Sequence, residues 1–375
     1  DRKPHPGLHA IKYVYRNLHA TAPAAAAGRI QVKNWWHFTN ARDVAEGFWT
    51  VTSEGTVLQS GTLPALDIEP GAARDFTLPI KAYTRKPGVE YWLNLSFRTK
   101  AHSPWARRGH ELAWEQFPLP GGPEAPRAQL GDFLKHGQLT VTQDDDSATL
   151  RGPNFVARFS KKDGLITGYT YKGTPLLERG PRVDFWRSRT DNDTGAAKGT
   201  NEAAQSDVQA TIRNWRNAGP LWNVKQADVE IVNDSTARII VKAEPANTGG
   251  ALVTMNYQVF SAGDIIVETT YQPGSARLNI MPRFGTELIL APGLENFTWY
   301  GRGPVETHID RQFERISVYR STVNKEWVNY SKPQENGNKT DVRWVALTNE
   351  RGVGLLAVGS PALSVAARHF TKDDV

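Results

Sequence analysis

Strict alternation of apolar and polar residues constrains the fold of this chain more than any other sequence feature. Neighbouring side chains of a β-strand point to opposite faces of the sheet, so a period of two places one face in a core. The clearest case is LVTMNYQVF, residues 252–260, with apolar Val253, Met255, Tyr257 and Val259. The pattern predicts a half-buried strand.

Similar stretches elsewhere predict further strands and hairpins. Residues 252–271 are interpreted as two strands joined by the turn SAGD, and residues 229–241 as a hairpin that turns at Asn233 and Asp234. In YWLNLSFR one face is apolar: Tyr91, Leu93, Leu95, Phe97. Helical periodicity favours only short helices near Trp105–Trp114 and Asn201–Trp215. The predicted class is all-β.

The segment FPLPGGPEAPRAQLGDF, residues 117–133, interrupts these strands with clustered prolines and glycines. Such a composition excludes regular structure and is typical of a stiff linker. The strands before it suit an immunoglobulin-like β-sandwich of about 100 residues. The longer remainder shows no alternation of strands with helices, so we expect a large antiparallel sandwich rather than a parallel sheet.

Composition excludes several classes of function. The chain of 375 residues has no cysteine, which removes disulfides, thiolate zinc sites and cysteine nucleophiles. No apolar run reaches the roughly 18 residues of a membrane helix, so no membrane partner is expected. The net charge of +6 is spread among 39 acidic residues without a basic block, so no nucleic-acid partner is expected either. The 12 tryptophans favour large core residues over sugar platforms.

The motif WYGRGPVETHIDR, residues 299–311, gathers charged, aromatic and glycine residues. It is not a phosphate-binding fingerprint, because Glu306 replaces the third glycine and Pro304 has no N–H. We expect its two glycines to permit a positive-φ turn that ends a strand at Trp299 and Tyr300. Charged residues of the motif are expected to pair across that turn: Arg302, Glu306, Asp310, Arg311.

A second motif, FWRSRTDNDTG, spans residues 185–195 and places Asp191, Asn192 and Asp193 after an aromatic pair. An EF-hand calcium loop is excluded because Gly195 stands where an oxygen ligand is needed. The carboxylates can hold a sugar hydroxyl or a hydrated cation, or can cap nearby backbone as Asx-turns. The sequence that follows is typical of a long mobile loop.

A third motif, KPQENGNKTDVRW, covers residues 332–344, and its Asn336-Gly337 pair predicts a tight turn. Its polar residues either satisfy one another or face a partner surface: Gln334, Glu335, Asn338, Asp341, Arg343.

Catalytic centres are poorly represented in the sequence. Glycoside hydrolysis needs two facing carboxyl groups, and three pairs are available: Asp191/Asp193, Glu306/Asp310, Glu335/Asp341. None follows a strand as a nucleophile with a partner acid. No G-x-S-x-G elbow occurs, and the nine histidines lack metal-ligand spacing. We therefore expect no catalytic residues and no metal site within the chain.

The three motifs, in this order and at these separations, closely resemble the C-terminal part of bacterial β-galactosidases of glycoside hydrolase family 2. The opening DRKPHPGLHAIKYVYRN resembles the segment by which that family leaves its catalytic barrel. The resemblance implies four regions: 1–13, exit segment; 14–117, immunoglobulin-like β-sandwich; 118–130, linker; 131–375, small-chain β-supersandwich related to the galactose mutarotase fold.

The resemblance also implies where the chemistry lies. The two catalytic glutamates and the Mg²⁺ and Na⁺ ligands of the family come mainly from the barrel, so this segment is expected to hold no cofactor. Its implied partners are a galactoside, such as lactose, the barrel domain of the same enzyme and a further copy in a homo-oligomer. Strands with a sugar-stacking tryptophan would follow Val375, and their absence would leave an unpaired sheet edge.

Site roles follow from motif position within the family. The pocket-side candidates are Trp186, Arg187, Asp191, Asn192, Asp193 and Gly195. Candidates for a corner that docks on the barrel, and for its bracing, are Trp299, Tyr300, Gly301, Arg302, Gly303, Pro304, Glu306, Asp310, Arg311, Gln334, Glu335, Asn336, Gly337, Asp341 and Arg343.

Two other functions stay open from the sequence. A stand-alone carbohydrate-binding module would need an exposed aromatic platform, for instance at Trp186 or Trp299. An epimerase would need an acid and a base at the anomeric hydroxyl, for which His308 with Glu306 is the candidate pair. The sequence does not distinguish a cytoplasmic from a periplasmic location.

Overall fold

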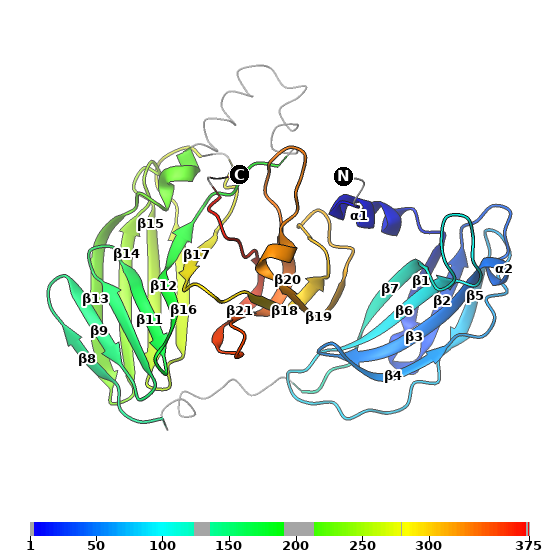
Figure 1. Ribbon diagram of the computed structural model, residues 1–375, viewed down its shortest axis with the longest axis horizontal. Helices are drawn as coiled ribbons and strands as arrows, with labels where there is room; N and C mark the ends of the chain where they lie inside the picture. Colours follow the sequence, from blue (N-terminus) through cyan, green and yellow to red (C-terminus); the bar gives the residue numbers. More distant parts are fainter. Residues whose placement is uncertain (1–3, 124–135, 191–213, 279, 373, 375) are drawn as a thin grey trace, which may run out of the picture.

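The computed structural model describes residues 4–123, 136–190, 214–278, 280–372 and 374 (Figure 1). Its regular secondary structure is mostly antiparallel strands, arranged in five sheets, which confirms the all-β class. Among the described residues, no helix has the length and apolar character needed to cross a bilayer.

The N-terminal module is a two-sheet sandwich preceded by a helix. One sheet has the strand order β1-β2-β5 and the other β4-β3-β6-β7. Its elements are α1 (Pro6–Val14), β1 (Leu18–Ala24), η1 (Ala25–Ala27), β2 (Arg29–Asn34), α2 (Ala41–Val44), β3 (Ala45–Ser53), β4 (Thr56–Thr62), β5 (Ala73–Thr77), β6 (Tyr91–Thr99) and β7 (Glu111–Leu119). The apolar face predicted for residues 91–97 is buried in this core, with Leu93, Leu95 and Phe97 at 0% exposure.

The C-terminal module contains three sheets. Their strand orders are β17-β12-β11-β10-β9-β8, β13-β14-β15-β16 and β19-β18-β20-β21. The elements are β8 (Thr140–Gln143), β9 (Ser147–Arg151), β10 (Phe155–Ser160), β11 (Leu165–Tyr171), β12 (Thr174–Asp184), β13 (Asn223–Asn233), β14 (Thr236–Glu244), β15 (Leu252–Phe260), β16 (Ile265–Gln272), β17 (Gly285–Leu290), β18 (Asn296–Gly303), β19 (Arg315–Thr322), η2 (Val323–Glu326), β20 (Lys339–Thr348) and β21 (Gly354–Val365). β21 stands at the edge of its sheet.

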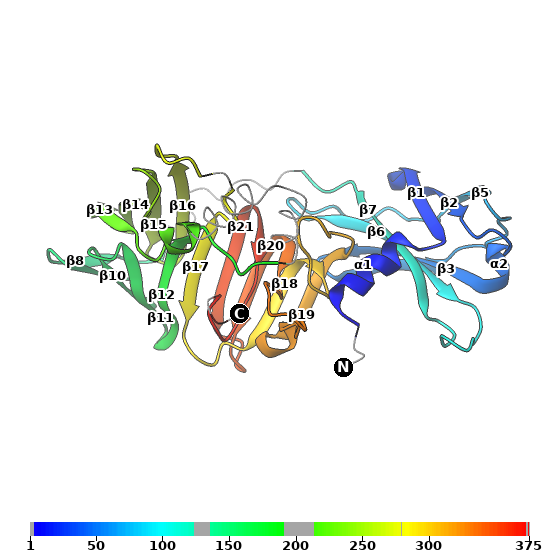
Figure 2. The same cartoon turned by 90° about the horizontal axis from the view of Figure 1, so that it is seen from above.

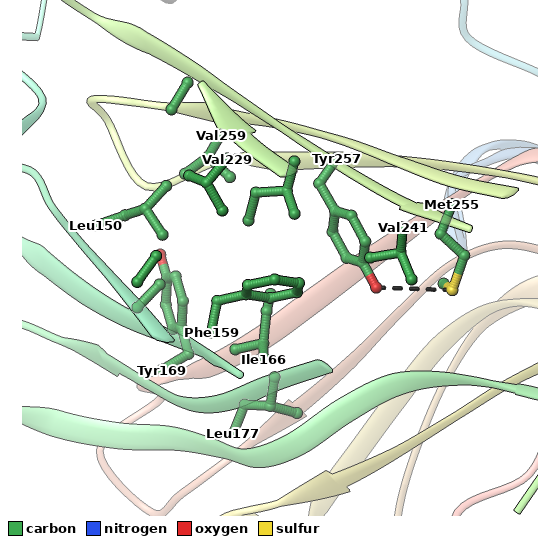
Figure 3. Packing of buried hydrophobic residues seen from close by; sticks show 14 of the residues in the cluster. Leu150, Phe159, Ile166, Tyr169, Leu177, Val229, Val241, Met255, Tyr257 and Val259 are labelled. Atoms are coloured by element: carbon green, nitrogen blue, oxygen red, sulfur yellow. Dashed lines mark hydrogen bonds between the residues drawn. The ribbon is translucent and has the colours of Figure 1, made fainter. Parts of the chain in front are cut away.

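The largest core lies between the six-stranded sheet and the β13–β16 sheet (Figure 3). The rings of Phe159 and Tyr257 meet across it with centroids 6.4 Å apart. The predicted alternation of residues 252–260 supplies one wall, because Val253, Met255, Tyr257 and Val259 are all at 0% exposure. Each such side chain contributes about 1.5–3 kcal/mol through burial.

Both predicted hairpins are confirmed. β15 and β16 form an antiparallel pair whose last residues before the turn are Val259 and Ile265. β13 and β14 form another, in which Asn233 and Thr236 flank the turn. The helix predicted near Trp105–Trp114 is wrong: residues 101–110 are irregular and β7 begins at Glu111, because pairing with β6 overrides a weak local preference. Of the other predicted helix, residues 201–213 lie outside the described residues and residues 214–218 are helical.

The predicted linker begins later than residue 118. Pro118 still pairs with Trp92 inside β7. Proline has no N–H to donate, and β7 tolerates it because it is the edge strand of its sheet. The segment 124–135 lies outside the described residues.

The two modules meet where the β4-β3-β6-β7 sheet faces β19, so that the β18–β21 sheet lies between the two sandwiches (Figures 1 and 2). Gln116 of β7 donates from Nε2 to the carbonyl of Ile316 at 2.9 Å and accepts from the Ile316 N–H at 2.8 Å. Arg315 donates to Glu111 at 2.6 Å, and the Trp114 indole donates to the Phe313 carbonyl at 3.2 Å. These backbone and side-chain hydrogen bonds therefore fix the position of one module against the other.

We predict that Gln116→Leu weakens this junction. The substitution leaves the N–H and C=O of Ile316 half-buried without partners, which costs about 1–3 kcal/mol. Urea unfolding, followed by tryptophan fluorescence, measures the loss. Gln59→Leu is the matched control, because Gln59 makes the same reciprocal pair with Lys81 at an exposed position where water can replace it. Equal losses in the two variants would contradict the prediction.

Candidate functional site

The three sequence motifs meet in the C-terminal module through backbone contacts. The Gly337 N–H of the third motif donates to Glu306 Oε2 of the first at 2.6 Å. The Glu335 N–H donates to the carbonyl of Arg189, in the second motif, at 3.4 Å. Segments far apart in sequence therefore form one candidate site, which we call the carboxylate corner: Glu306, His308, Arg311, Tyr330, Glu335, Gly337.

Glu306 is the centre of this corner and is 3% exposed. Its Oε1 accepts from Arg311 Nη2 at 2.5 Å and from the Tyr330 hydroxyl at 2.8 Å, and lies 3.1 Å from His308 Nε2. With the Gly337 N–H, four groups surround one carboxylate. Burial of a charge is tolerated when it is paired and hydrogen-bonded in this way.

The surroundings of Glu306 keep it ionised. Burial raises the pKa of its carboxyl, but the hydrogen bond and charge of His308, the Gly337 N–H and the Tyr330 hydroxyl together outweigh burial and lower the pKa to about 2. Burial is the main cause that raises the pKa of Tyr330 to about 12, and the charge of Glu306 is the second. The Glu306 carboxylate is therefore a stable anion that accepts hydrogen bonds from neutral and cationic donors.

The glycines of the first motif act differently from the prediction. Trp299 and Tyr300 do not end their strand, because β18 continues through Gly301 to Gly303 without a positive-φ turn. A Cβ at Gly301 would lie 2.8 Å from Val342 Cγ2, and one at Gly303 would lie 2.9 Å from the Trp299 ring. Close packing, rather than backbone conformation, requires glycine here.

The charged residues of the first motif divide between two sets of partners. Arg311 pairs with Glu306, as expected, whereas Arg302 donates to Asp341 Oδ2 at 2.5 Å and to the Glu314 carbonyl at 2.8 Å. Asp310 and Pro304 are both exposed. The expected ion-pair network thus extends to the third motif instead of closing within one turn.

Asp341 and Arg343 connect the site to the N-terminal module. Asp341 has a φ of 51°, a conformation uncommon for residues other than glycine. Arg343 donates to its carbonyl and makes a bidentate pair with Glu90 at 2.7 and 2.8 Å. Its guanidinium also lies 5.6 Å from the Tyr300 ring. Such a bidentate pair fixes geometry as well as charge.

Glu335 is a second buried carboxylate, 2% exposed, with two guanidinium partners. Arg283 donates to its Oε1 at 3.0 Å, and Arg368 donates to both carboxylate oxygens. Burial raises the pKa of Glu335, but the charges of Arg283 and Arg368 outweigh it and the pKa is lowered. Arg283 also approaches Asp184 at 3.6 Å, so it joins the third motif to the strand that leads into the second.

Contacts hold the part of the second motif that the structure describes, residues 185–190. Lys372 pairs with Asp184, and the Ser188 hydroxyl donates to the Lys372 carbonyl at 2.7 Å. Trp186 donates its N–H to Asp184 Oδ1 at 3.1 Å, and Arg187 is half-buried. The remaining pocket-side candidates lie outside the described residues: Asp191, Asn192, Asp193, Gly195.

The predicted tight turn at Asn336-Gly337 is wrong. Residues 332–338 follow an irregular path into β20, although Gly337 has the positive φ, 75°, that its type favours. The Asn336 side chain accepts from the Val328 N–H at 3.3 Å and donates to the Gln334 carbonyl at 3.0 Å. The segment does not form a solvent-exposed hairpin turn, because it is buried against Glu306 and Arg368.

The two tryptophans named as examples of a sugar platform are buried. Trp186 and Trp299 are 7% and 1% exposed, so neither forms an open platform for a sugar. Within the described residues, no group of three histidine, aspartate or glutamate side chains converges as a metal site. Glu306 and Glu335 each hold cationic partners of their own.

Five residues that pair with charged groups of the three motifs or of Asp184 were not predicted from the sequence: Glu90, Arg283, Tyr330, Arg368, Lys372. Each stands alone in the sequence, outside the three motifs or at their margin, and carries no spacing signal. Their roles arise only because distant strands bring them to buried carboxylates.

The comparisons with known proteins agree with this architecture of two β modules joined at a buried corner. Residues 151–375 match the family described as beta galactosidase small chain, and residues 30–120 match beta-galactosidase domain 4. The chain belongs to the β-galactosidase small-chain family.

Two curated relatives illustrate the extent of the match. The chain is 31% identical to the β-galactosidase of Priestia megaterium over 98% of its length, which is 34% of that protein. It is 30% identical to the β-galactosidase of Lactobacillus delbrueckii subsp. bulgaricus over 94% of its length and 32% of that protein. The chain thus spans about a third of the length of these relatives.

We predict that Glu306→Gln destabilises the fold in a pH-dependent manner. The folded pKa of about 2 lies below the ordinary value of 4.5, so the charge stabilises the fold above that value and the stabilisation is lost as the pH falls toward 2. Near neutral pH the free energy of unfolding should fall by about 3 kcal/mol.

Urea unfolding of both proteins at several pH values measures this effect, and the difference between them should shrink below about pH 4.5. Glu230→Gln is the control, because Glu230 pairs with Arg238 on an exposed strand and should change stability by less than about 1 kcal/mol. A difference between wild type and Glu306→Gln that stays constant from neutral to acidic pH would contradict the assignment.

Proposed function

We propose that this chain is the C-terminal, non-catalytic portion of a retaining β-galactosidase. It would form one wall of the galactose pocket and the scaffold behind that wall. The observation that carries the proposal is the meeting of the three motifs around Glu306 and Glu335, in a chain whose two modules match two β-galactosidase domains. Hydrolysis itself would use two carboxyl groups from the rest of the longer protein.

Glu306 supports a structural rather than a catalytic role. A general base must accept a proton near neutral pH, and a nucleophile must reach the substrate. Glu306 is buried, has a pKa of about 2 and is bonded to four donors. The His308–Glu306 pair at 3.1 Å therefore gives little support to the epimerase alternative.

The metal ions implied by the resemblance are proposed to bind elsewhere in the longer protein. A hard cation such as Mg²⁺ needs several free oxygen ligands. Glu306 and Glu335 already bond to arginine or tyrosine side chains, and Asp184 pairs with Lys372. The described residues contain no group of three histidine, aspartate or glutamate side chains that could hold a metal, so this donor set does not fit one.

The contribution of the corner to catalysis would be positional. Arg283 and Lys372 pair with Asp184, and Arg368 pairs with Glu335, whose N–H donates to the Arg189 carbonyl. Residues 184–190 lead directly into the pocket-side candidates at 191–195. Positioning groups of this kind contribute to turnover because small displacements at a reacting centre reduce the rate strongly.

The first test compares the 375-residue chain with the longer protein that contains it. The longer protein should hydrolyse a chromogenic β-galactoside with retention of configuration at the anomeric carbon, and the chain alone should release no product. Release of galactose by the purified chain, free of host enzyme, would contradict the non-catalytic assignment. Absence of activity in the longer protein would contradict the proposed family activity.

A second test concerns Arg283 in the longer protein. Arg283→Met keeps the length of the side chain but leaves Glu335 with one cationic partner and removes the link to Asp184. Turnover should fall roughly ten- to hundredfold through displacement of residues 184–190. Arg238→Met is the control, since Arg238 pairs with Glu230 on an exposed strand. Unchanged turnover in Arg283→Met would remove the positional role.

A further inference from the structure

A cleft of about 280 Å³ opens in the C-terminal module where β11 and β12, neighbours in one sheet, meet the segment that leads into β13 (Figure 1). Its lining comes from three stretches, within residues 162–167, 179–182 and 220–224. None of them belongs to the three sequence motifs or to the carboxylate corner. We call it the β12 cleft. Its volume lies at the lower end of the range for small-molecule sites, so it suits a small ligand.

Positive charge is in excess around the β12 cleft. Its charged lining residues are three bases and one acid: Lys162, Arg179, Arg182, Asp163. The acid already has a partner, because Asp163 Oδ2 accepts from the Ser160 hydroxyl at 2.6 Å. Like charges gathered at one place repel one another, and an anion bound among them removes that cost.

A β-bulge in β12 brings two of these bases to the same cleft. Arg179 pairs with Ile289 of β17 and Arg182 pairs with Glu287, so three residue steps along β12 correspond to two along β17. In a regular strand, residues three apart point to opposite faces of the sheet. The extra residue in β12 changes this alternation, and both arginines line the cleft. Bulges that redirect side chains in this way are frequent beside functional sites.

The residues between the two arginines specify the bulge. Gly180 has a φ of 126°, which side-chain-bearing residues rarely adopt, and a Cβ there would lie 2.8 Å from the Glu287 carbonyl oxygen. Pro181 follows it, and proline is tolerated at bulges because it has no N–H to pair. The common direction of the two arginines is therefore encoded in the sequence of β12.

Trp222 supplies an apolar wall of the cleft. Its indole Nε1 donates to the Asp163 carbonyl at 3.1 Å. Gly164 leaves room for the ring, because a Cβ at this position would lie 3.4 Å from Trp222 Cζ2 and 2.8 Å from Val241 Cγ1. Further apolar lining comes from Leu165, Pro220 and Val224. The cleft thus combines an apolar wall with a few charged groups, as small-molecule sites do.

Two of the three bases are available to a ligand. Arg182 pairs with Glu287 at 3.0 Å. Lys162 and Arg179 are exposed, and neither forms an ion pair with any residue that the structure describes. Two unpaired positive charges match the charge of about −1.5 to −2 that a phosphate group carries near neutral pH.

We infer that the β12 cleft binds the phosphate group of a small ligand. Arg179 offers a planar fork for two phosphate oxygens, and Lys162 offers a point charge. The phosphate is either free or carried by a small molecule such as a sugar, whose ring would contact the Trp222 wall. A nucleic acid would need a longer basic surface than these three bases provide. The inference goes beyond the proposed function, because no motif residue takes part in it.

Isothermal titration calorimetry of the 375-residue chain at low ionic strength tests the inference with three probes: inorganic phosphate, glucose 6-phosphate and glucose. Both phosphates should bind with a Kd of about 1 mM or tighter, and neutral glucose should not bind. Tighter binding of glucose 6-phosphate than of inorganic phosphate would identify a phosphorylated sugar as the source, and equal binding would identify free phosphate. No binding of either phosphate at about 10 mM, or equal binding of glucose and glucose 6-phosphate, would overturn the inference.

Substitutions of the two available bases locate the site. Arg179→Gln and Lys162→Gln should each weaken phosphate binding roughly tenfold, through loss of one charge-assisted hydrogen bond. Both positions are exposed, so the thermal unfolding temperature without ligand should not change.

Arg158→Gln is the matched control, because Arg158 is an exposed base on β10 of the same sheet and does not line the cleft. It should change the Kd by less than about twofold. Wild-type affinity in Arg179→Gln and Lys162→Gln would overturn the assignment. An equal loss in all three variants would show general attraction to a chain of net charge +6, and would overturn it as well.

Discussion

The buried carboxylate of Glu306 is the interaction on which the candidate site depends. Its partners come from three places in the sequence: the motif that contains it, Tyr330 after β19, and the Gly337 backbone before β20. An ionised acid is costly to bury without such partners. The same charge that would destabilise an unpaired site therefore specifies how these segments meet.

Polar contacts link the two modules at three places. Arg343 reaches Glu90 in the N-terminal module, and Gln116 pairs with the backbone of β19 in the other direction. Helix α1 adds a third link near the Glu306 corner. A surface held at three points suits the proposed role as a pocket wall, which requires constant geometry.

Local patterns predicted the strands well and the polar sites poorly. The alternation at residues 252–260 predicted a strand because one face of it is buried on a large core. The Asn336-Gly337 pair failed as a turn signal, because burial against Glu306 and Arg368 outweighed the local preference. The turn predicted from Gly301 and Gly303 was also wrong, since close packing against Val342 and Trp299 is what requires glycine at these positions. Partners such as Arg283 carried no signal at all.

The sequence by itself determined the all-β class and, through motif resemblance, the family, because these depend on periodicity, composition and the order of the motifs within one chain. Only the tertiary structure decided which acids are buried, which cations hold them, and which cations line one cleft. The reason is physical: the energy of a charged side chain depends on neighbours brought from distant strands, and no local pattern contains them.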